Sequence, residues 1–125
     1  MPRKAINAPN AVAVGPYSHA TETANLVFFS GQTPIHAATG ALVSGGIAEQ
    51  TRQCFANLFA VLHHAGLTPD AVQKVNVYLT DMANFSAMNE VYRAQFSEPY
   101  PARTTIGVAA LPLGAQVEIE MIAHK

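Results

Sequence analysis

The chain has 125 residues, half of them hydrophobic and only 12% charged, which fits one compact domain over residues 1–125 and excludes a disordered protein. Its seven Lys and Arg and eight Asp and Glu are scattered along the chain, so no basic stripe indicates a nucleic-acid partner. We expect a cytosolic protein with no membrane partner, because the sequence has a single cysteine, no secretory h-region and no apolar run near the roughly 20 residues of a membrane span.

The first half of the chain predicts three strands and a long helix. The strands are expected at about residues 5–7, 19–23 and 26–30. Ala24-Asn25, between the last two, is typical of the turn of a tight hairpin. A helix is predicted over residues 47–65, because apolar residues recur there at helical spacing and Gly66 then supplies a stop.

The second half predicts a strand, a helix and two further strands. The strand covers residues 72–79, and the helix begins near Asn84, a natural N-cap, and ends before Pro99. The last strands are expected at about residues 104–108 and 117–123. The order β-β-β-α-β-α-β-β describes an α+β sheet that carries both helices on one face.

The alternation of side chains predicts that both faces of this sheet are largely apolar. Leu26 and Phe28 point to one face and Val27 and Phe29 to the other. Two helices cover only one face, so the second apolar face must be buried against something else. A symmetric homo-oligomer with its sites between subunits is the simplest solution.

Charged residues interrupt the apolar strands near the C-terminus. Because a charge removed from water without a partner is costly, Arg103, Glu118 and Glu120 indicate either a ligand site or a structural ion pair between strands. An antiparallel pairing of the two strands would bring Arg103 and Glu118 together across a cleft. Glu120 has a simpler interpretation as a solvated residue at the sheet edge.

The sequence predicts no metal and no cofactor. His63 and His64 are adjacent on the first helix and point about 100° apart, so they do not chelate one ion together. Cys54 lies among apolar helix residues and is expected to be a buried, inert thiol. Gly45-Gly46 lacks the Lys-Ser or Lys-Thr that follows in a phosphate-binding loop.

Several short segments, in this order and spacing, carry a resemblance to a known family. They are Gly15–Ala20, Ser30–Pro34, Val75–Met82 with the following Phe85, Asn89 and Tyr92, Pro101–Arg103, and Val117–Glu120. No single segment is decisive, but together they cover essentially the whole chain. The sequence resembles the RidA family, also called YjgF or L-PSP.

The resemblance implies a chorismate-mutase-like fold, with a six-stranded, mostly antiparallel sheet and two helices on one face. It implies a homotrimer around a central barrel, with a cleft at each interface. The implied reaction is cofactor-free, hydrolytic deamination of reactive 2-imino acids and enamines, such as 2-iminobutanoate and 2-iminopropanoate, to 2-oxo acids and ammonia. The alternatives are aminomuconate-type substrates, or a family member that acts as an endoribonuclease, a translation inhibitor or a small-ligand-binding protein.

The resemblance also implies the site residues. Arg103 would clamp the substrate carboxylate through its planar fork, and Glu118 would orient or deprotonate water. The main chain at Thr105, where some members carry Cys, would help to bind the water and the substrate. The predicted substrate-binding residues are Tyr17, Ser30, Gly31, Phe85, Asn89 and Pro112. From the residues alone, Tyr17 is equally a turn residue, Phe85 a core residue and Asn89 a satisfied buried amide.

Overall fold

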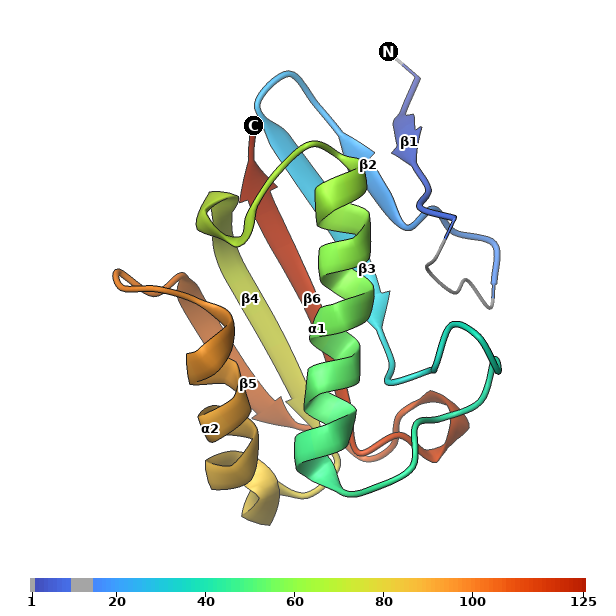
Figure 1. Ribbon diagram of the computed structural model, residues 1–125, viewed down its shortest axis with the longest axis vertical. Coiled ribbons are helices and arrows are strands. Elements are labelled where there is room, and N and C mark those ends of the chain that lie inside the picture. The colour runs from blue at the N-terminus through green and yellow to red at the C-terminus, as the bar shows by residue number, and fades with distance from the viewer. Residues whose placement is uncertain (1, 10–14) are drawn as a thin grey trace.

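A computed structural model of the chain describes residues 2–9 and 15–125. Within these residues, a six-stranded sheet is covered on one face by two α-helices (Figure 1). The helices are α1 (Ile47–His64) and α2 (Phe85–Gln95). The strands are β1 (Lys4–Ile6), β2 (Ala20–Glu22), β3 (Leu26–Gln32), β4 (Val72–Leu79), β5 (Ala102–Gly107) and β6 (Val117–His124). All of the predicted helices and strands are therefore confirmed, with small changes at their ends.

The strands follow the order β1-β2-β3-β6-β4-β5 across the sheet. Four of the neighbouring pairs are antiparallel, and β4 and β5, which α2 connects, are parallel. Thus β6 lies in the middle of the sheet and β5 at its edge. The expected direct pairing between the strand of Arg103 and the strand of Glu118 is wrong, because β4 lies between β5 and β6.

Helix α1 packs across β6 and β3 and supplies much of the core (Figure 1). The Glu49 carboxylate accepts a hydrogen bond of 3.1 Å from the Gly46 backbone N–H, which satisfies one free donor at the helix start. The apolar face buries Phe55, Leu58 and other residues at helical spacing. The helix ends as predicted before Gly66, whose φ of +81° favours glycine.

Helix α2 begins directly after Asn84, close to the predicted start, but the Asn84 side chain makes no capping hydrogen bond. Asn84 is also the last residue of a 3₁₀ turn, η2 (Met82–Asn84), that precedes the helix. The start of this turn is capped by Asp81, whose carboxylate accepts a hydrogen bond of 2.9 Å from the Ala83 N–H. The inner face of α2 buries Met88, Val91 and Tyr92.

The core lies between the helices and the inner face of the sheet. Alternate residues of β4 and β6 point into it, and aromatic rings of both helices pack beside them with centroids 5.3 to 5.9 Å apart. The fully buried strand residues are Val75, Val77, Leu79, Val117, Ile119 and Met121. Cys54 is buried in this core as predicted, and burial raises the pKa of its thiol well above 9.0.

The face of the sheet away from the helices is mixed, so the expectation of a largely apolar second face is only partly right. Phe28 and Ile106, towards the two sides of this face, are 42% and 45% exposed. Between them, Glu118, Glu120 and Asn76 occupy the outward positions of β6 and β4. We call this surface the open face. The glutamates lie there because the inward positions of β6 are filled by core residues.

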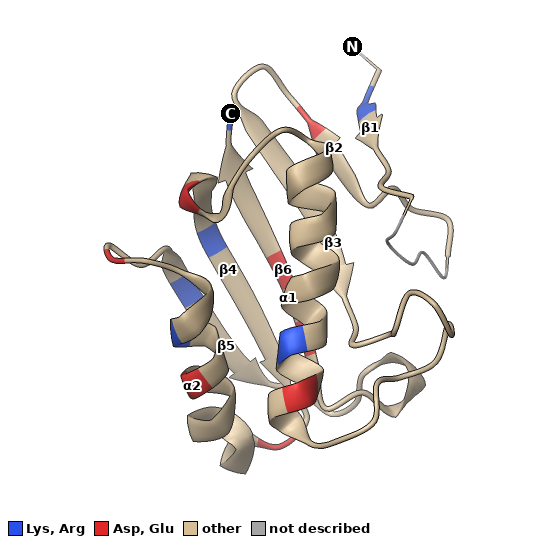
Figure 2. Ribbon diagram, viewed as in Figure 1, with Lys and Arg blue, Asp and Glu red and all other residues tan. Residues whose placement is uncertain are grey.

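Charged residues are spread over both helices and most strands (Figure 2). Nowhere in residues 2–9 and 15–125 do three or more His, Cys, Asp or Glu side chains gather in a way that would hold a metal ion. His63 and His64 are exposed at the end of α1. Among the described helices, none combines the length and the apolar character needed to cross a membrane.

Candidate active site

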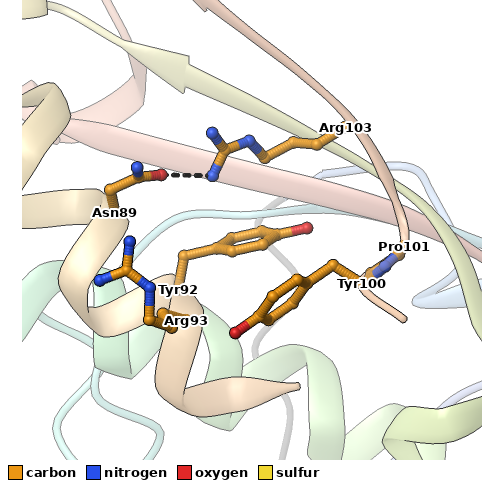
Figure 3. Close-up of a pocket in the computed structure, with 6 residues that line it drawn as sticks. All are labelled: Asn89, Tyr92, Arg93, Tyr100, Pro101 and Arg103. Carbon is orange, nitrogen blue, oxygen red and sulfur yellow. Dashed lines mark hydrogen bonds between the residues drawn. The ribbon is translucent and has the colours of Figure 1, made fainter. Parts of the chain in front are cut away.

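Arg103 projects from β5 towards α2 and is held there by three side chains. Its Nη1 donates a hydrogen bond of 2.6 Å to the Asn89 Oδ1 (Figure 3). The guanidinium carbon lies 4.6 Å from the centre of the Tyr92 ring and 5.5 Å from that of Phe85. These contacts fix a planar cation without neutralising it, because the amide and the rings carry no net charge. An anion can therefore bind to the remaining N–H donors.

A cavity of about 350 Å³ opens beside this guanidinium (Figure 3). Its walls are Asn89, Tyr92, Arg93, Tyr100, Pro101 and Arg103. Sequence reasoning missed Tyr92, Arg93 and Tyr100 as site residues. Tyr92 could have been found, because it lies on the same helical face as Phe85 and Asn89. Its buried hydroxyl has no hydrogen-bond partner among the described residues, which leaves a donor at the cavity.

Thr105 lies two residues after Arg103 on the same side of β5. It pairs in register with Val77 of β4, as Arg103 does with Val75, so both side chains point to the helix side. The Thr105 hydroxyl is buried and has no hydrogen-bond partner in the described part of the chain. The side chain itself is therefore a polar group with unused capacity near Arg103, in addition to the main chain that the resemblance implies.

Glu118 lies on the open face of β6, directly opposite Tyr78 of β4. Partial burial, and secondarily the nearby negative charge of Glu120, raise the pKa of its carboxyl above the ordinary 4.5. A carboxyl with a raised pKa is a stronger base and is better suited to accept a proton from water near neutral pH.

Gly31 touches the Glu118 carboxylate from the neighbouring strand. An irregularity in the β3–β6 register between Phe29 and Gln32 brings the Gly31 backbone close to Glu118. A Cβ atom on Gly31 would lie 2.5 Å from the Glu118 Oε2, which is too close unless the carboxylate moves away. The absence of a side chain at this position therefore allows the carboxylate to occupy its place.

Ser30 and Tyr17 lie around a second hollow, of about 530 Å³, which also includes Ser18 and Phe28. The Ser30 hydroxyl donates a hydrogen bond of 2.7 Å to the Ser18 carbonyl, which ties β3 to the segment that carries Tyr17. Pro112 is exposed in the 3₁₀ turn η3 (Pro112–Gly114), in the loop that leads into β6.

The predicted site residues thus form two separate groups. We call Arg103, Thr105, Phe85 and Asn89, which lie on the helix side of the sheet, the arginine half. We call Glu118, Gly31, Ser30 and Tyr17, which lie at or beside the open face, the glutamate half. Because Arg103 and Glu118 point to opposite faces of the sheet, with β4 between their strands, one chain does not bring them together.

Glu120 differs from its predicted place. It lies on the central strand β6 and not at the edge of the sheet. Its Oε1 accepts hydrogen bonds from the Tyr78 hydroxyl and, at 3.2 Å, from the Asn76 side-chain amide. The bond to Glu120 also raises the pKa of Tyr78 to about 12, so this hydroxyl keeps its proton and remains a donor. Glu120 is therefore part of a polar cluster and is not simply solvated.

Comparisons with known proteins agree with this architecture. A family model described as endoribonuclease L-PSP matches residues 6–125. A RutC family protein of Pyrococcus horikoshii is 47% identical over 119 residues, which cover 95% of this chain and 93% of the relative. A mouse protein named 2-iminobutanoate/2-iminopropanoate deaminase is 42% identical, with 97% of this chain and 90% of the relative covered.

Solved structures show the same relationship at the level of the fold. The crystal structure of RidA from an Antarctic Psychrobacter superposes with a TM-score of 0.94 at 44% sequence identity, and the match covers 98% of this chain and all of that one. The match of the family model, the extent of the sequence identity and the shared fold all point to one conclusion. The chain belongs to the RidA family, whose family model is described as endoribonuclease L-PSP.

Proposed function

We propose that this protein hydrolyses small 2-imino acids to 2-oxo acids and ammonia, in a cleft formed where two copies of the chain meet. The observation that carries the proposal is the state of Arg103, a half-buried guanidinium fixed by Asn89 beside an open cavity and without an acidic partner in the described residues. Such a cation binds a small carboxylate. The name of the mouse relative supports 2-iminobutanoate and 2-iminopropanoate as the substrates.

The reaction needs one water molecule and one group that carries a proton. Arg103 holds the substrate carboxylate, and this fixes the position of the neighbouring C=N carbon. Water adds to that carbon while Glu118 accepts a proton from it. Glu118 passes this proton to the nitrogen, which gives a carbinolamine. Glu118 then takes the proton of the new hydroxyl group and passes it to the nitrogen as well, so the C–N bond breaks, the carbon–oxygen double bond of the 2-oxo acid forms and ammonia leaves. The proposed reaction uses only the substrate, water and these side chains, without a cofactor.

The separation of the two halves supports a cleft between subunits. If the arginine half of one copy faces the glutamate half of the next, each copy uses two different surfaces. Such contacts are heterologous, and they close into a ring when the rotation between copies allows it. The homotrimer implied by the family resemblance is the ring that we propose.

Two alternatives to this function are RNA cleavage and the deamination of other substrates. An endoribonuclease activity, which the description of the family model names, finds little support in the scattered charges of this chain (Figure 2), because RNA binding relies on clustered cations. Aminomuconate-type substrates remain an alternative within the deaminase class.

The proposed compartment is the cytosol, which fractionation of cells that express the chain would test.

The first experiment measures deamination directly. A dehydratase generates 2-iminobutanoate or 2-aminoacrylate, and semicarbazide traps the imine that this protein has not hydrolysed. We expect wild type to compete with the trap, Arg103→Ala and Glu118→Ala to lose that ability, and Arg52→Ala, an exposed arginine on α1, to retain it. Wild type that leaves the trapping rate unchanged would overturn the deaminase assignment. Parallel assays with aminomuconate-type compounds and RNA test the alternatives.

A second experiment tests the cleft between subunits. Arg103→Ala and Glu118→Ala are each inactive, but co-refolding them in equal amounts places an intact arginine half opposite an intact glutamate half in some interfaces. Random assembly of heterologous rings predicts that about one quarter of wild-type activity returns. If both groups acted within a single chain, mixing would restore no activity. Each variant, refolded alone under the same conditions, is the control.

A further inference from the structure

Glu120 and its two partners form a polar cluster that the proposed reaction does not use. The cluster lies at the centre of the open face, where Tyr78 and Asn76 of β4 donate hydrogen bonds to the same Glu120 oxygen of β6. Two donors on one oxygen hold the Glu120 carboxylate in a fixed position beside the neighbouring residues of β6. Because Tyr78 holds its proton to about pH 12, it does not compete with Glu120 for ionisation at physiological pH.

The cluster lies beside Glu118 on the open face. Glu118 and Glu120 are two residues apart on one strand, so their side chains lie on the same face. Tyr78 stands opposite Glu118 and Asn76 opposite Glu120 in the β4–β6 register. A like charge nearby disfavours the charged form of a carboxyl group. Burial and the charge of Glu120 both raise the pKa of Glu118.

The other titratable groups near this pair are few. On β4, Lys74 lies on the same face, but its Nζ donates to the Thr104 Oγ1 at 3.0 Å. On the helix side, the Cys54 thiol lies behind β6 at 3.7 Å from the Val117 carbonyl and stays neutral. His124 is at the far end of β6. In the proposed assembly a neighbouring Arg103 faces Glu118, and the substrate carboxylate binds that guanidinium.

We propose that Glu120, fixed by Tyr78 and Asn76, is a positioning residue that makes Glu118 the proton carrier of the site. The inference rests on the proposed function only in giving Glu118 its catalytic role. Glu118 must carry one proton from water to nitrogen in the addition step and a second, from the new hydroxyl group to nitrogen, in the elimination step. The negative charge of Glu120 raises the pKa of Glu118 and so strengthens Glu118 as a base for the first step. Glu120 itself touches neither water nor substrate in this scheme.

The first test measures the protonation of Glu118 without any substrate. Wild type labelled with ¹³C at the glutamate carboxyls is titrated by NMR, and the Glu118→Gln spectrum assigns the signal. We expect the Glu118 titration midpoint to move to lower pH in Glu120→Gln, and by a smaller amount in the same direction in Tyr78→Phe. Asp70→Asn, which removes an exposed charge outside the cluster, should leave the midpoint in place. An unchanged midpoint in Glu120→Gln and Tyr78→Phe overturns the proposal.

The second test measures the consequence for catalysis. In Glu120→Gln the acidic limb of the kcat/KM profile should move to lower pH, and kcat on the plateau should fall roughly two- to fivefold with KM unchanged, because the base is weaker. If Glu120 had a merely structural role, kcat and kcat/KM would both fall while the acidic limb of the pH profile stayed in place. That result overturns the proposal. If wild type shows no deamination at all, the proposed function fails, while the NMR titration still decides whether Glu120 controls Glu118. Should Glu120→Gln not fold, Tyr78→Phe supplies both readouts.

Discussion

Substituting Gly31 with alanine should abolish most of the proposed deaminase activity while leaving the fold in place. The φ angle of Gly31 is not in the left-handed region, so alanine fits the backbone without strain. The new methyl group, however, would lie 2.5 Å from the Glu118 Oε2 and 3.1 Å from its Cδ. The change therefore acts on the position of one carboxylate.

The size of the effect follows from these distances. Non-bonded atoms settle at roughly 3.5 Å, so the carboxylate must move by about 1 Å. A misplacement of about 1 Å in a catalytic group costs on the order of 100-fold in rate, which corresponds to roughly 2.7 kcal/mol of activation free energy. The free energy of unfolding should change by no more than about 1 kcal/mol, because only the far end of a partly exposed side chain moves.

The imine-trapping assay and urea unfolding together test this prediction. We expect kcat to fall about 100-fold while KM changes little, because the arginine half is untouched. Gly46→Ala is the matched control, since a Cβ atom at Gly46 meets nothing within 4 Å. Gly31→Ala with wild-type kcat, in a protein that Glu118→Ala inactivates, would refute the reasoning. A large loss of stability in Gly31→Ala would also refute it.

Four further predictions concern single side chains. Arg103→Lys should lower kcat/KM by roughly 100-fold in the trapping assay, because an ammonium does not reproduce the planar contacts with Asn89 and Tyr92; activity within a few-fold of wild type would contradict this. Tyr92→Phe should leave the urea midpoint unchanged or raise it, because the buried hydroxyl has no partner to lose in the described chain; a clear loss of stability would show a bond that the structure lacks. Relative to wild type, Glu118→Gln should become increasingly more stable as the pH rises above 4.5. The pKa of Glu118 is raised in the folded state, so folded wild type binds this proton more tightly than the unfolded chain does and loses stability as the pH rises. Thermal unfolding of both proteins between pH 4 and 8 measures the difference. Cys54 should resist iodoacetamide at pH 8 in the folded protein and react in urea, as mass spectrometry would show, because burial raises its pKa; rapid labelling of the folded protein would be inconsistent with this burial.

The helices and strands could be predicted because their signals are local. The periodicity of α1 and the stop at Gly66 are properties of one segment, and both are confirmed. The start of α2 near Asn84 is also confirmed, but the Asn84 side chain makes no capping hydrogen bond, and a 3₁₀ turn capped by Asp81 precedes the helix. Propensity alone does not predict such a short turn before a helix.

The site was predicted only in part, because its geometry depends on strand order and register. Alternation shows that Arg103 and Thr105 share one face of their strand, but not whether that face is the one that carries Glu118. The structure resolves this through β4, whose register with β5 and β6 places Arg103 and Glu118 on opposite faces. Periodicity places Tyr92 on the same helical face as Asn89, but only the structure shows that this face borders the cavity.

Strand β5 carries Arg103, the arginine that we propose binds the substrate, at the outer edge of the sheet. Within the described chain, β4 is the only strand that pairs with β5, and Ile106 is 45% exposed on it. An edge of this kind is a template on which other chains can pair and aggregate. If neighbouring copies cover β5, dilution or interface mutations should reduce not only activity but also colloidal solubility, and precipitation would then report the loss of assembly.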